Sequence, residues 1–392
     1  MSTDIKLPKD WKWVKLNEIS DKISLNKIKI KQKDYLQEGM YPVVDQGQDL
    51  IGGYFNDENL IVPKEPPYII FGDHTKIKKF INFKFIPGAD GVKVLKAKEI
   101  IDSKFLFYSL YTIKIEDKGY ARHFQLLEKE LFPLPPFSTQ QSIVSKIEEL
   151  FSELDNGIAN LKTAQQQLKT YRQSVLKWAF EGKLTNKNVK EGELPEHWFL
   201  IPMKKIAKFI DYRGRTPKKT NSGIPLITAK NVKMGFINDE PREYISPDDY
   251  EVFMTRGIPK INDVLFSTEA PMGNVALLHT KNKIALAQRL ITFQCYDIIL
   301  PAFLKYSIMN PKFQEILNKK GTGTTVKGIK AATLKELEIP VPSLKEQEII
   351  IQEIESRLSV ADKMEESINQ SLQQAEALRQ SILKKAFEGK LI

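Results

Sequence analysis

A long segment near the middle of the chain is repeated at its end. RQSVLKWAFEGKL at residues 172–184 matches RQSILKKAFEGKL at residues 379–391, an offset of 207 residues. A shorter match, LPKDW at residues 7–11 and LPEHW at residues 194–198, opens each intervening region. Self-similarity at this spacing fixes the architecture of a chain. We therefore predict globule and repeated segment in alternation, with boundaries at residues 1–137, 138–190, 191–342 and 343–392.

The repeated segments have the heptad pattern of coiled-coil helices. Apolar residues recur every seven positions at Ile147, Leu154, Leu161, Leu168 and Val175, and in the second copy at Ile354, Ile368 and Ile382. A companion column is expected three residues on, from Leu150 to Trp178. Because a single helix would leave this stripe in water, we expect an antiparallel coiled coil with one globule at each end. The alternative is two separate helices that each cap their own globule.

Both repeated segments carry start and stop signals for a helix. Prolines precede each segment, and Ser138 and Ser343 are the expected N-caps. Gly182 and Gly389 follow the last apolar turn, where C-caps lie. The shared AFEGKL ending has two explanations. It forms equal docking surfaces for two copies of one partner, or it reflects recent internal duplication alone.

The composition favours a cytoplasmic protein that binds a polyanion. A single cysteine, Cys295, excludes a disulfide framework and fits a reducing compartment. The N-terminal residues lack a signal-peptide core, and no apolar run is long enough for a membrane span. The net charge is +10, and residues 191–340 carry 22 basic and 16 acidic side chains. Nucleic acid is therefore the expected partner, ahead of membrane. The alternative is that the charge only provides solubility.

Both globules are predicted to be α+β domains with a mixed or barrel-like sheet. Short β-rich runs broken by Gly, Pro, Asn and Asp lie at residues 41–48, 67–73, 79–88, 223–232, 263–278 and 284–295. Helical stretches follow late in each globule, at residues 102–113 and 300–319. The two globules otherwise look largely unlike, which suggests that one frame holds readers of two different targets.

Several loops combine basic and polar side chains with Gly or Pro, a composition suited to phosphates and base edges. In the first globule the candidate DNA-binding residues are Lys76, Lys78, Lys79, Arg122, His123 and Gln125. In the second they are Arg213, Arg215, Lys218, Lys219, Lys230, Asn231, Lys327 and Lys330. Asn231 is suited to adenine, and the glycine-rich loop at residues 321–330 to a closely approaching phosphate. Each loop taken singly is more often a solvated turn, but their presence in both globules favours binding.

The sequence carries no convincing catalytic motif. EPPY at residues 65–68 has glutamate where amino-methyltransferases need another residue type, so its prolines are expected to open a strand. GTGTT at residues 321–325 lacks the Gly-Lys-Ser/Thr of a P-loop. The four histidines are scattered, without the spacing of metal ligands. We therefore predict a binding protein with neither a metal site nor a catalytic site.

The repeated segments and the LP..W openings together resemble the specificity (S) subunit of type I restriction–modification systems, over essentially the whole chain. The residues that carry this resemblance lie at 133–150 and 340–358, at the two RQS ends and at the two LP..W openings. The resemblance implies two target-recognition domains that each read half of a split DNA site. It further implies an antiparallel coiled-coil spacer, two adenine-N6 methyltransferase subunits that carry S-adenosylmethionine, and restriction subunits. No cofactor and no chemistry are expected in the S subunit itself.

The predicted mechanism is positional: each globule binds one half-site, and the helices set the number of unread base pairs between them. Replacing Arg213 or Arg215 by alanine is expected to weaken binding at one half-site by about 1–3 kcal/mol if these residues read bases. One alternative is a two-lobed coiled-coil adaptor without DNA specificity. Another is a methyltransferase with divergent motifs, which would bind S-adenosylmethionine unaided.

Overall fold

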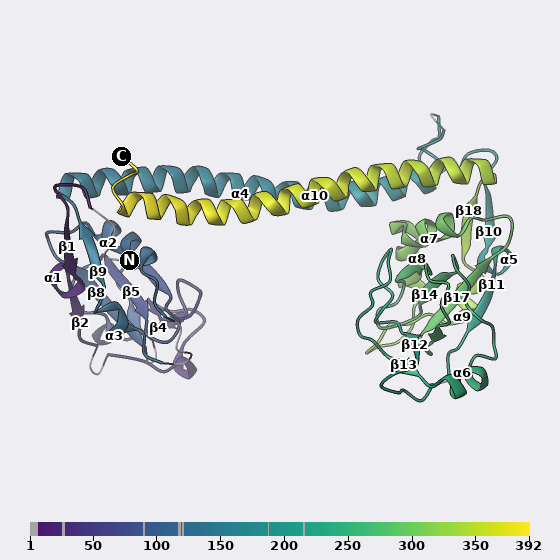
Figure 1. The fold of residues 1–392 in the computed structure, drawn as a ribbon, viewed down its shortest axis with the longest axis horizontal. Coiled ribbons are helices and arrows are strands. Elements are labelled where there is room, and N and C mark those ends of the chain that lie inside the picture. Colours follow the sequence, from purple (N-terminus) through teal and green to yellow (C-terminus); the bar gives the residue numbers. More distant parts are fainter. Residues whose placement is uncertain are drawn as a thin grey trace. The chain divides into compact units, whose positions relative to one another are not determined.

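The computed structural model describes residues 7–25, 28–88, 91–116, 119, 121–186, 188–214 and 216–392. The chain divides into two compact units, Met1–Lys162 with Asn369–Ile392, and Thr163–Ile368. Each unit contains one α+β domain and part of both long helices, α4 and α10 (Figure 1). No helix among the described residues is both long and apolar enough to cross a membrane.

The repeated segments form the two long helices, α4 (Phe137–Phe180) and α10 (Leu344–Phe387). Each has 44 residues, about 65 Å at 1.5 Å per residue. The helices run antiparallel within each unit. In the first unit Asp155 of α4 forms an ion pair with Arg379 of α10. In the second unit the equivalent residues exchange roles, because Arg172 of α4 pairs with Asp362 of α10 at 2.6 Å.

The predicted first column of the heptad lies between the helices. Ile147, Val175, Ile354 and Ile382 are buried, and Leu154, Leu161, Leu168 and Ile368 are half-buried. The predicted companion column is wrong, since Tyr171 and Trp178 are 38% and 45% exposed. The second column lies four residues on from the first instead of three, and includes Ile158, Arg172 and Ala179.

The first domain contains one two-stranded, one four-stranded and one three-stranded sheet. The two-stranded sheet pairs β1 (Lys12–Lys15) with β9 (Leu131–Leu134). The four-stranded sheet has the order β2 (Ser20–Ile23), β8 (Val92–Ala97), β5 (Tyr68–Gly72) and β6 (Lys78–Ile81). The three-stranded sheet has the order β4 (Gly53–Phe55), β3 (Tyr41–Val44) and β7 (Ile86–Pro87). The helices are α1 (Leu16–Ile19), α2 (Ser103–Ser109) and α3 (Phe124–Leu127), with 3₁₀ turns at Gln32–Asp34, Glu58–Leu60 and Leu110–Thr112.

The second domain has the same sheet plan, which the expectation of two largely unlike globules missed. Its two-stranded sheet pairs β10 (Phe199–Pro202) with β18 (Glu338–Val341). Its four-stranded sheet has the order β11 (Ala207–Asp211), β17 (Leu290–Cys295), β14 (Val264–Ser267) and β15 (Val275–Leu277). Its three-stranded sheet has the order β13 (Tyr244–Ile245), β12 (Ile224–Ile227) and β16 (Ala285–Leu286). The helices are α5 (Met203–Ile206), α6 (Pro247–Phe253), α7 (Pro301–Met309), α8 (Pro311–Lys320) and α9 (Ala331–Lys335).

The ends of the long helices are part of the domain cores. Phe387 of α10 packs on Phe105 of α2 in the first unit, with ring centroids 4.8 Å apart. Phe180 of α4 packs on Phe303 of α7 in the second unit, at 5.1 Å. Burial of each such ring contributes about 1.5–3 kcal/mol. The end of each long helix is therefore held in the hydrophobic core of a domain.

A buried glutamine holds the start of each long helix to its domain. Gln140 is fully buried; its Nε2 donates to the carbonyls of Ile100 and Pro135, and its Oε1 accepts the N–H of Asp102 at 2.7 Å. Gln347 makes the equivalent three bonds, to the carbonyls of Ile298 and Pro342 and the N–H of Leu300. Each helix start is therefore tied to its domain by the same three hydrogen bonds.

The shared AFEGKL ending has an intramolecular explanation. Gly182 and Gly389 have φ of +74° and +71°, and the following lysine in each copy donates its N–H to a carbonyl of the last helical turn. A Cβ at Gly182 would overlap Pro195, and one at Gly389 would overlap Pro8. The two prolines belong to the repeated LP..W openings. Each helix end therefore packs against the start of the domain in its own unit.

The two expected N-caps differ. The side chain of Ser343 accepts the N–H of Glu346 at 3.3 Å, one residue before α10 begins. Ser138 lies inside α4, which begins at Phe137, so this prediction is wrong. Pro136 directly precedes the helix and its carbonyl accepts the N–H of Gln140, which leaves Ser138 in the first turn.

Candidate nucleic-acid interface

Three segments of the first domain meet at one end of its four-stranded sheet. Asp73 directly follows β5, and its N–H donates to the carbonyl of Gly91, just before β8, at 2.7 Å. The carbonyl of Asp73 accepts the N–H of His123, just before α3, at 2.8 Å. The first candidate loop of this domain, residues 73–80, and the described part of the second, residues 121–125, are therefore brought together.

The second domain has the same junction. Thr268 directly follows β14, and its N–H donates to the carbonyl of Arg289, just before β17, at 3.0 Å. The carbonyl of Thr268 accepts the N–H of Ile329, near the start of α9, at 3.0 Å. The glycine-rich loop at residues 321–330 thus occupies the position that residues 121–125 occupy in the first domain.

Four of the candidate residues of the first domain have side chains at least partly accessible at this junction. Arg122 and Gln125 are exposed, while Lys76 and Lys78 are half-buried. Lys76 lies in the turn between β5 and β6 with a φ of +59°. Cationic and amide side chains in this arrangement suit phosphate oxygens and base edges.

Lys79 and His123 have internal partners, which corrects their predicted contact with DNA. Lys79 is 5% exposed, and its ammonium group lies 3.8 Å from the carboxylate of Asp45. Burial lowers the pKa of Lys79, opposed by the charge of Asp45. His123 is fully buried, with Nδ1 3.0 Å from the carbonyl oxygen of Asp73. Neither side chain can reach DNA from this position; both hold the loops in place.

Lys78 has the most strongly shifted pKa of the candidate lysines. Its ammonium nitrogen lies 4.7 Å from the centroid of the Tyr111 ring, and the Tyr111 hydroxyl donates to the Lys78 carbonyl at 3.1 Å. Burial, with a smaller contribution from the charge of Lys76, lowers the pKa of Lys78 to about 8. The charge of this group is therefore sensitive to mildly alkaline pH.

In the second domain Arg213 is held by a carboxylate. Its Nε and Nη2 donate to Asp211, the latter at 2.6 Å, and its Nη1 donates to the carbonyl of Ile329 at 3.2 Å. Burial alone would raise the pKa of Asp211, but the hydrogen bonds and charge of Arg213 outweigh it and lower that pKa. Arg256 donates to the carbonyls of Asp211 and Arg213, at 2.8 and 3.0 Å. Arg213 thus links the end of β11 to the glycine-rich loop.

A polar cavity of about 310 Å³ lies at this junction. The residues that line it are Arg213, Gly214, Thr268, Glu269, Gln288, Thr322, Val326, Gly328, Ile329 and Lys330. Arg213 and Gly214 of one predicted binding loop therefore face the glycine-rich loop at residues 321–330 across it. Thr268, Glu269 and Gln288 complete the wall, and the sequence analysis did not select them.

Asn231 does not fit its predicted role as a reader of adenine. It is 2% exposed, and its Oδ1 accepts the N–H of Thr228 at 2.9 Å. Its Nδ2 donates to the carbonyls of Asn238 and Pro241, at 3.0 and 3.1 Å. Because every polar atom of its amide is used inside the loop, Asn231 fixes the loop after β12 and cannot contact a base.

The remaining candidates of the second domain that the structure describes are exposed. Lys218 and Lys230 lie on separate loops, and Lys219 pairs with Glu243 at 2.7 Å. Lys327 and Lys330 belong to the glycine-rich loop beside the cavity. Arg215 lies outside the residues that the structure describes. The structure thus brings Arg213, Lys327 and Lys330 to one place and leaves Lys230 on another loop.

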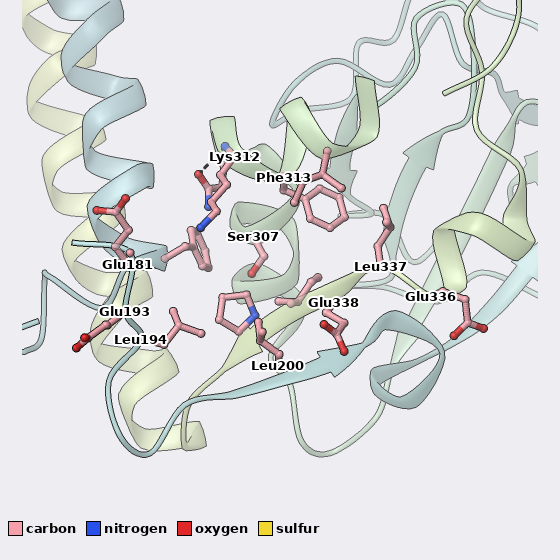
Figure 2. A pocket seen from close by; sticks show the side chains of 16 residues that line it. Glu181, Glu193, Leu194, Leu200, Ser307, Lys312, Phe313, Glu336, Leu337 and Glu338 are labelled. Atoms are coloured by element: carbon pink, nitrogen blue, oxygen red, sulfur yellow. Dashed lines mark hydrogen bonds between the residues drawn. The ribbon is translucent and has the colours of Figure 1, made fainter. Parts of the chain in front are cut away.

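A second cavity of about 440 Å³ lies between the end of α4, the strand β18 and helices α7 and α8 (Figure 2). Its apolar wall includes Phe313 and Leu337. The acidic residues that line it are Glu181, Glu193, Glu336 and Glu338, with Lys312 as the basic residue. This excess of carboxylates repels phosphate, so the cavity is unsuited to a DNA backbone. No cluster of three or more His, Cys, Asp or Glu that could hold a metal occurs among the described residues.

A family model and curated relatives both match type I specificity subunits. A family model described as type I restriction modification DNA specificity domain matches residues 8–169 and 195–376. The MjaVIII specificity subunit of Methanocaldococcus jannaschii is 24% identical over 367 residues, covering 86% of this chain and 84% of that protein. The EcoR124I/EcoR124II specificity subunit of Escherichia coli is 26% identical over 355 residues, covering 84% and 82%.

Solved structures share the fold. A chain from a structure of complex assembly and conformational transition of the type I R-M system superposes with a TM-score of 0.74 at 20% identity, covering 98% of this chain and 100% of that chain. The HsdS subunit from Thermoanaerobacter tengcongensis gives a TM-score of 0.60 at 19% identity, covering 99% of each chain. Because the family model matches two stretches, residues 8–169 and 195–376, that together make up most of the chain, the chain belongs to the type I restriction modification DNA specificity family.

Proposed function

We propose that this chain is the sequence-specific DNA-recognition subunit of a type I restriction–modification complex, in which each domain reads one half of a split DNA site. The observation that carries the proposal is the shared junction. In each domain three loops meet at the same end of the four-stranded sheet, where basic and amide side chains gather. The side chains at the junction differ between the domains, as reading two different half-sites requires.

The partners proposed with this role are two adenine-N6 methyltransferase subunits and restriction subunits. Methylation of adenine requires the base to leave the stack, which the methyltransferase subunit would perform with its own S-adenosylmethionine. The present chain would supply recognition and positioning, without chemistry of its own. Family membership supports this division of roles, because its relatives are named as specificity subunits.

We further propose that α4 and α10 set the number of unread base pairs between the half-sites. Each helix is anchored in a domain core by its terminal phenylalanine, and each start is held by a buried glutamine. Contact with a domain core at each end of a helix is a property that a spacer needs. Inserting one heptad into both helices is expected to lengthen the unread spacer without changing either half-site.

The test is the salt dependence of DNA binding by the complex with its methyltransferase subunits. A protein that neutralises six to ten phosphates is expected to lose roughly 10³- to 10⁵-fold in affinity between 50 and 200 mM salt. The second part of the test is preference for one split sequence over scrambled duplexes at fixed salt. Binding that neither responds to salt nor discriminates between sequences would contradict the proposal. The adaptor without DNA specificity, which the family does not favour, would then account for the fold.

A further inference from the structure

We propose that Gln288, Arg289 and Glu269 are the base-reading side chains of the second domain, and that Arg213 is a positioning residue which does not read bases. This inference rests on the proposed function and names the specificity determinants within it. Gln288 and Glu269 line the polar cavity, and Arg289 lies directly beside Gln288. These three residue types are suited to adenine, guanine and cytosine in the major groove: an amide for adenine, a guanidinium for guanine and a carboxylate for cytosine.

Gln288 presents an oriented amide with a free donor. Its Oε1 accepts the hydroxyl of Thr216 at 3.0 Å, which orients the amide. Its Nε2 has no hydrogen-bond partner among the residues that the structure describes, and the side chain is only half-buried. Its backbone lies just before β17, next to the hydrogen bond from Thr268 to Arg289, so its position is fixed by the sheet. A side chain held at its base with a free amide donor suits a base edge.

Arg289 and Glu269 form an ion pair across the same junction. Their charged groups lie 2.8 Å apart, and the side chains are 50% and 39% exposed. An exposed pair of this kind adds little to stability, because water already solvates both charges. The pair does place two groups of opposite hydrogen-bonding character beside the cavity, which Glu269 lines and which Arg289 adjoins next to Gln288. Guanine and cytosine present the complementary groups.

The glycine-rich loop frames these side chains. Thr322 and Gly328 exchange backbone hydrogen bonds of 2.9 Å, which closes the loop, and Gly328 also bridges to Glu269. Lys327 and Lys330 are exposed on this loop and have no ion-pair partner among the described residues. Free lysines beside polar readers are suited to the phosphates that flank a base pair, and such contacts set register without sequence information.

The guanidinium of Arg213 is already hydrogen-bonded within the domain. Its guanidinium donates to both oxygens of Asp211 and to the carbonyl of Ile329, so three of its five donors are used inside the domain. A base contact would require Arg213 to leave this bidentate carboxylate, and its side chain is only 29% exposed, against 50% for Arg289 in its single ion pair. Its removal is expected to loosen the glycine-rich loop and weaken binding for all sequences alike, whereas removal of a base reader changes the preferred sequence.

The experiment is selection of duplexes from a randomised pool by the full complex with its methyltransferase subunits, compared between wild type and variants. The variants are Gln288→Ala, Arg289→Ala, Glu269→Gln and Arg213→Ala, with Arg242→Ala as control. Arg242 is an exposed arginine of the same domain, paired with Glu240 at 3.2 Å and absent from the lining of the cavity. Circular dichroism of each variant checks that it is folded.

The expected result is that each of the first three variants loses about tenfold to hundredfold discrimination at one or two base pairs of one half-site. The other half-site should remain unchanged, and Arg213→Ala and Arg242→Ala should retain the wild-type sequence. The inference is overturned, with the proposed function intact, if the wild type selects a split site and the first three variants select the same one. A wild type that selects no site would overturn both.

Discussion

At the scale of single residues, two buried glutamines hold the starts of the long helices to their domains through their amide groups. Gln140 and Gln347 each satisfy one N–H and two carbonyls at a junction where α2 or α7 approaches the start of a long helix. An amide is the side chain that can donate twice and accept at the same time. Alanine at either position would leave one buried and two partly buried backbone groups without this partner.

Gln140→Ala and Gln347→Ala are therefore each expected to lower the free energy of unfolding by about 1–3 kcal/mol. Gln141→Ala is the matched control, because Gln141 is exposed in the adjacent position of α4. It should change stability by less than about 0.5 kcal/mol. Denaturant unfolding followed by circular dichroism measures both. Equal stability of Gln140→Ala and Gln141→Ala would contradict the assigned role.

Lys78 gives a prediction about pH. Because burial lowers its pKa to about 8, the side chain is mostly charged at pH 7 and loses its charge as the pH rises through about 8. A contact between Lys78 and phosphate would then weaken over the same range. Affinity for DNA is expected to fall between pH 7 and pH 9 in the wild type and to fall less in Lys78→Arg, since arginine stays charged.

The control for this pH profile is Lys129→Arg, which exchanges an exposed lysine of the same domain. It should keep the wild-type dependence on pH. Fluorescence anisotropy with labelled duplex at fixed ionic strength gives the affinities. If Lys78→Arg and the wild type lose affinity in parallel, Lys78 does not contact DNA.

At the site, the sequence predicted the binding loops but not which of their side chains are free to bind. The composition of the loops predicted two of the segments that line the cavity, Arg213 with Gly214 and the glycine-rich loop at residues 321–330. It could not separate a basic side chain that faces solvent from one that is used internally. Arg213 is satisfied by Asp211 two residues away, and Lys79 by Asp45, which directly follows β3. Gln288 was missed because it lies within an apolar run that predicts only a strand.

At the scale of elements, two glycines terminate the long helices under the same two constraints. Gly182 and Gly389 have positive φ, and each lies against a proline where a Cβ would overlap. Alanine at either position is expected to lower the free energy of unfolding by about 1–3 kcal/mol, from backbone strain and steric overlap. Thermal unfolding of each variant measures the change.

Gly157→Ala is the opposite case and serves as the control. Gly157 lies in the middle of α4, with no atom within 4 Å of an added Cβ. Alanine should stabilise this helix by roughly 0.5–1 kcal/mol, because it has less conformational entropy to lose. If Gly182→Ala and Gly157→Ala change stability in the same direction, the packing of the helix ends is not as described.

The heptad pattern predicted the helices and their first buried column but not the second. Columns three and four residues on both lie near the first, and apolar residues such as Leu150 and Trp178 favoured the former. The column four residues on contains a charged residue, Arg172. It forms ion pairs with Asp362 and Glu365 of the facing helix. Ion pairs with residues of the facing helix determine which of the two columns lies between the helices. The spacing of apolar residues in one helix does not reveal these pairs.

At the scale of the whole molecule, internal duplication extends to the domains. Both have sheets of two, four and three strands in equivalent orders. The sequence concealed this, because strands of two to six residues carry few matching positions and the loops between them differ. A protein built in this way keeps its frame while its loops change, which is the property that altered DNA specificity requires.

The measurement that tests the central claim most directly is mapping of methylated adenines by single-molecule sequencing in cells that express this chain with its methyltransferase subunit. It is repeated for a chimera in which residues 191–340 are replaced by the equivalent domain of another specificity subunit. The account predicts N6-methyladenine at one split motif, with one half retained and the other half replaced in the chimera. Methylation without a motif, or a motif unchanged in the chimera, would contradict it.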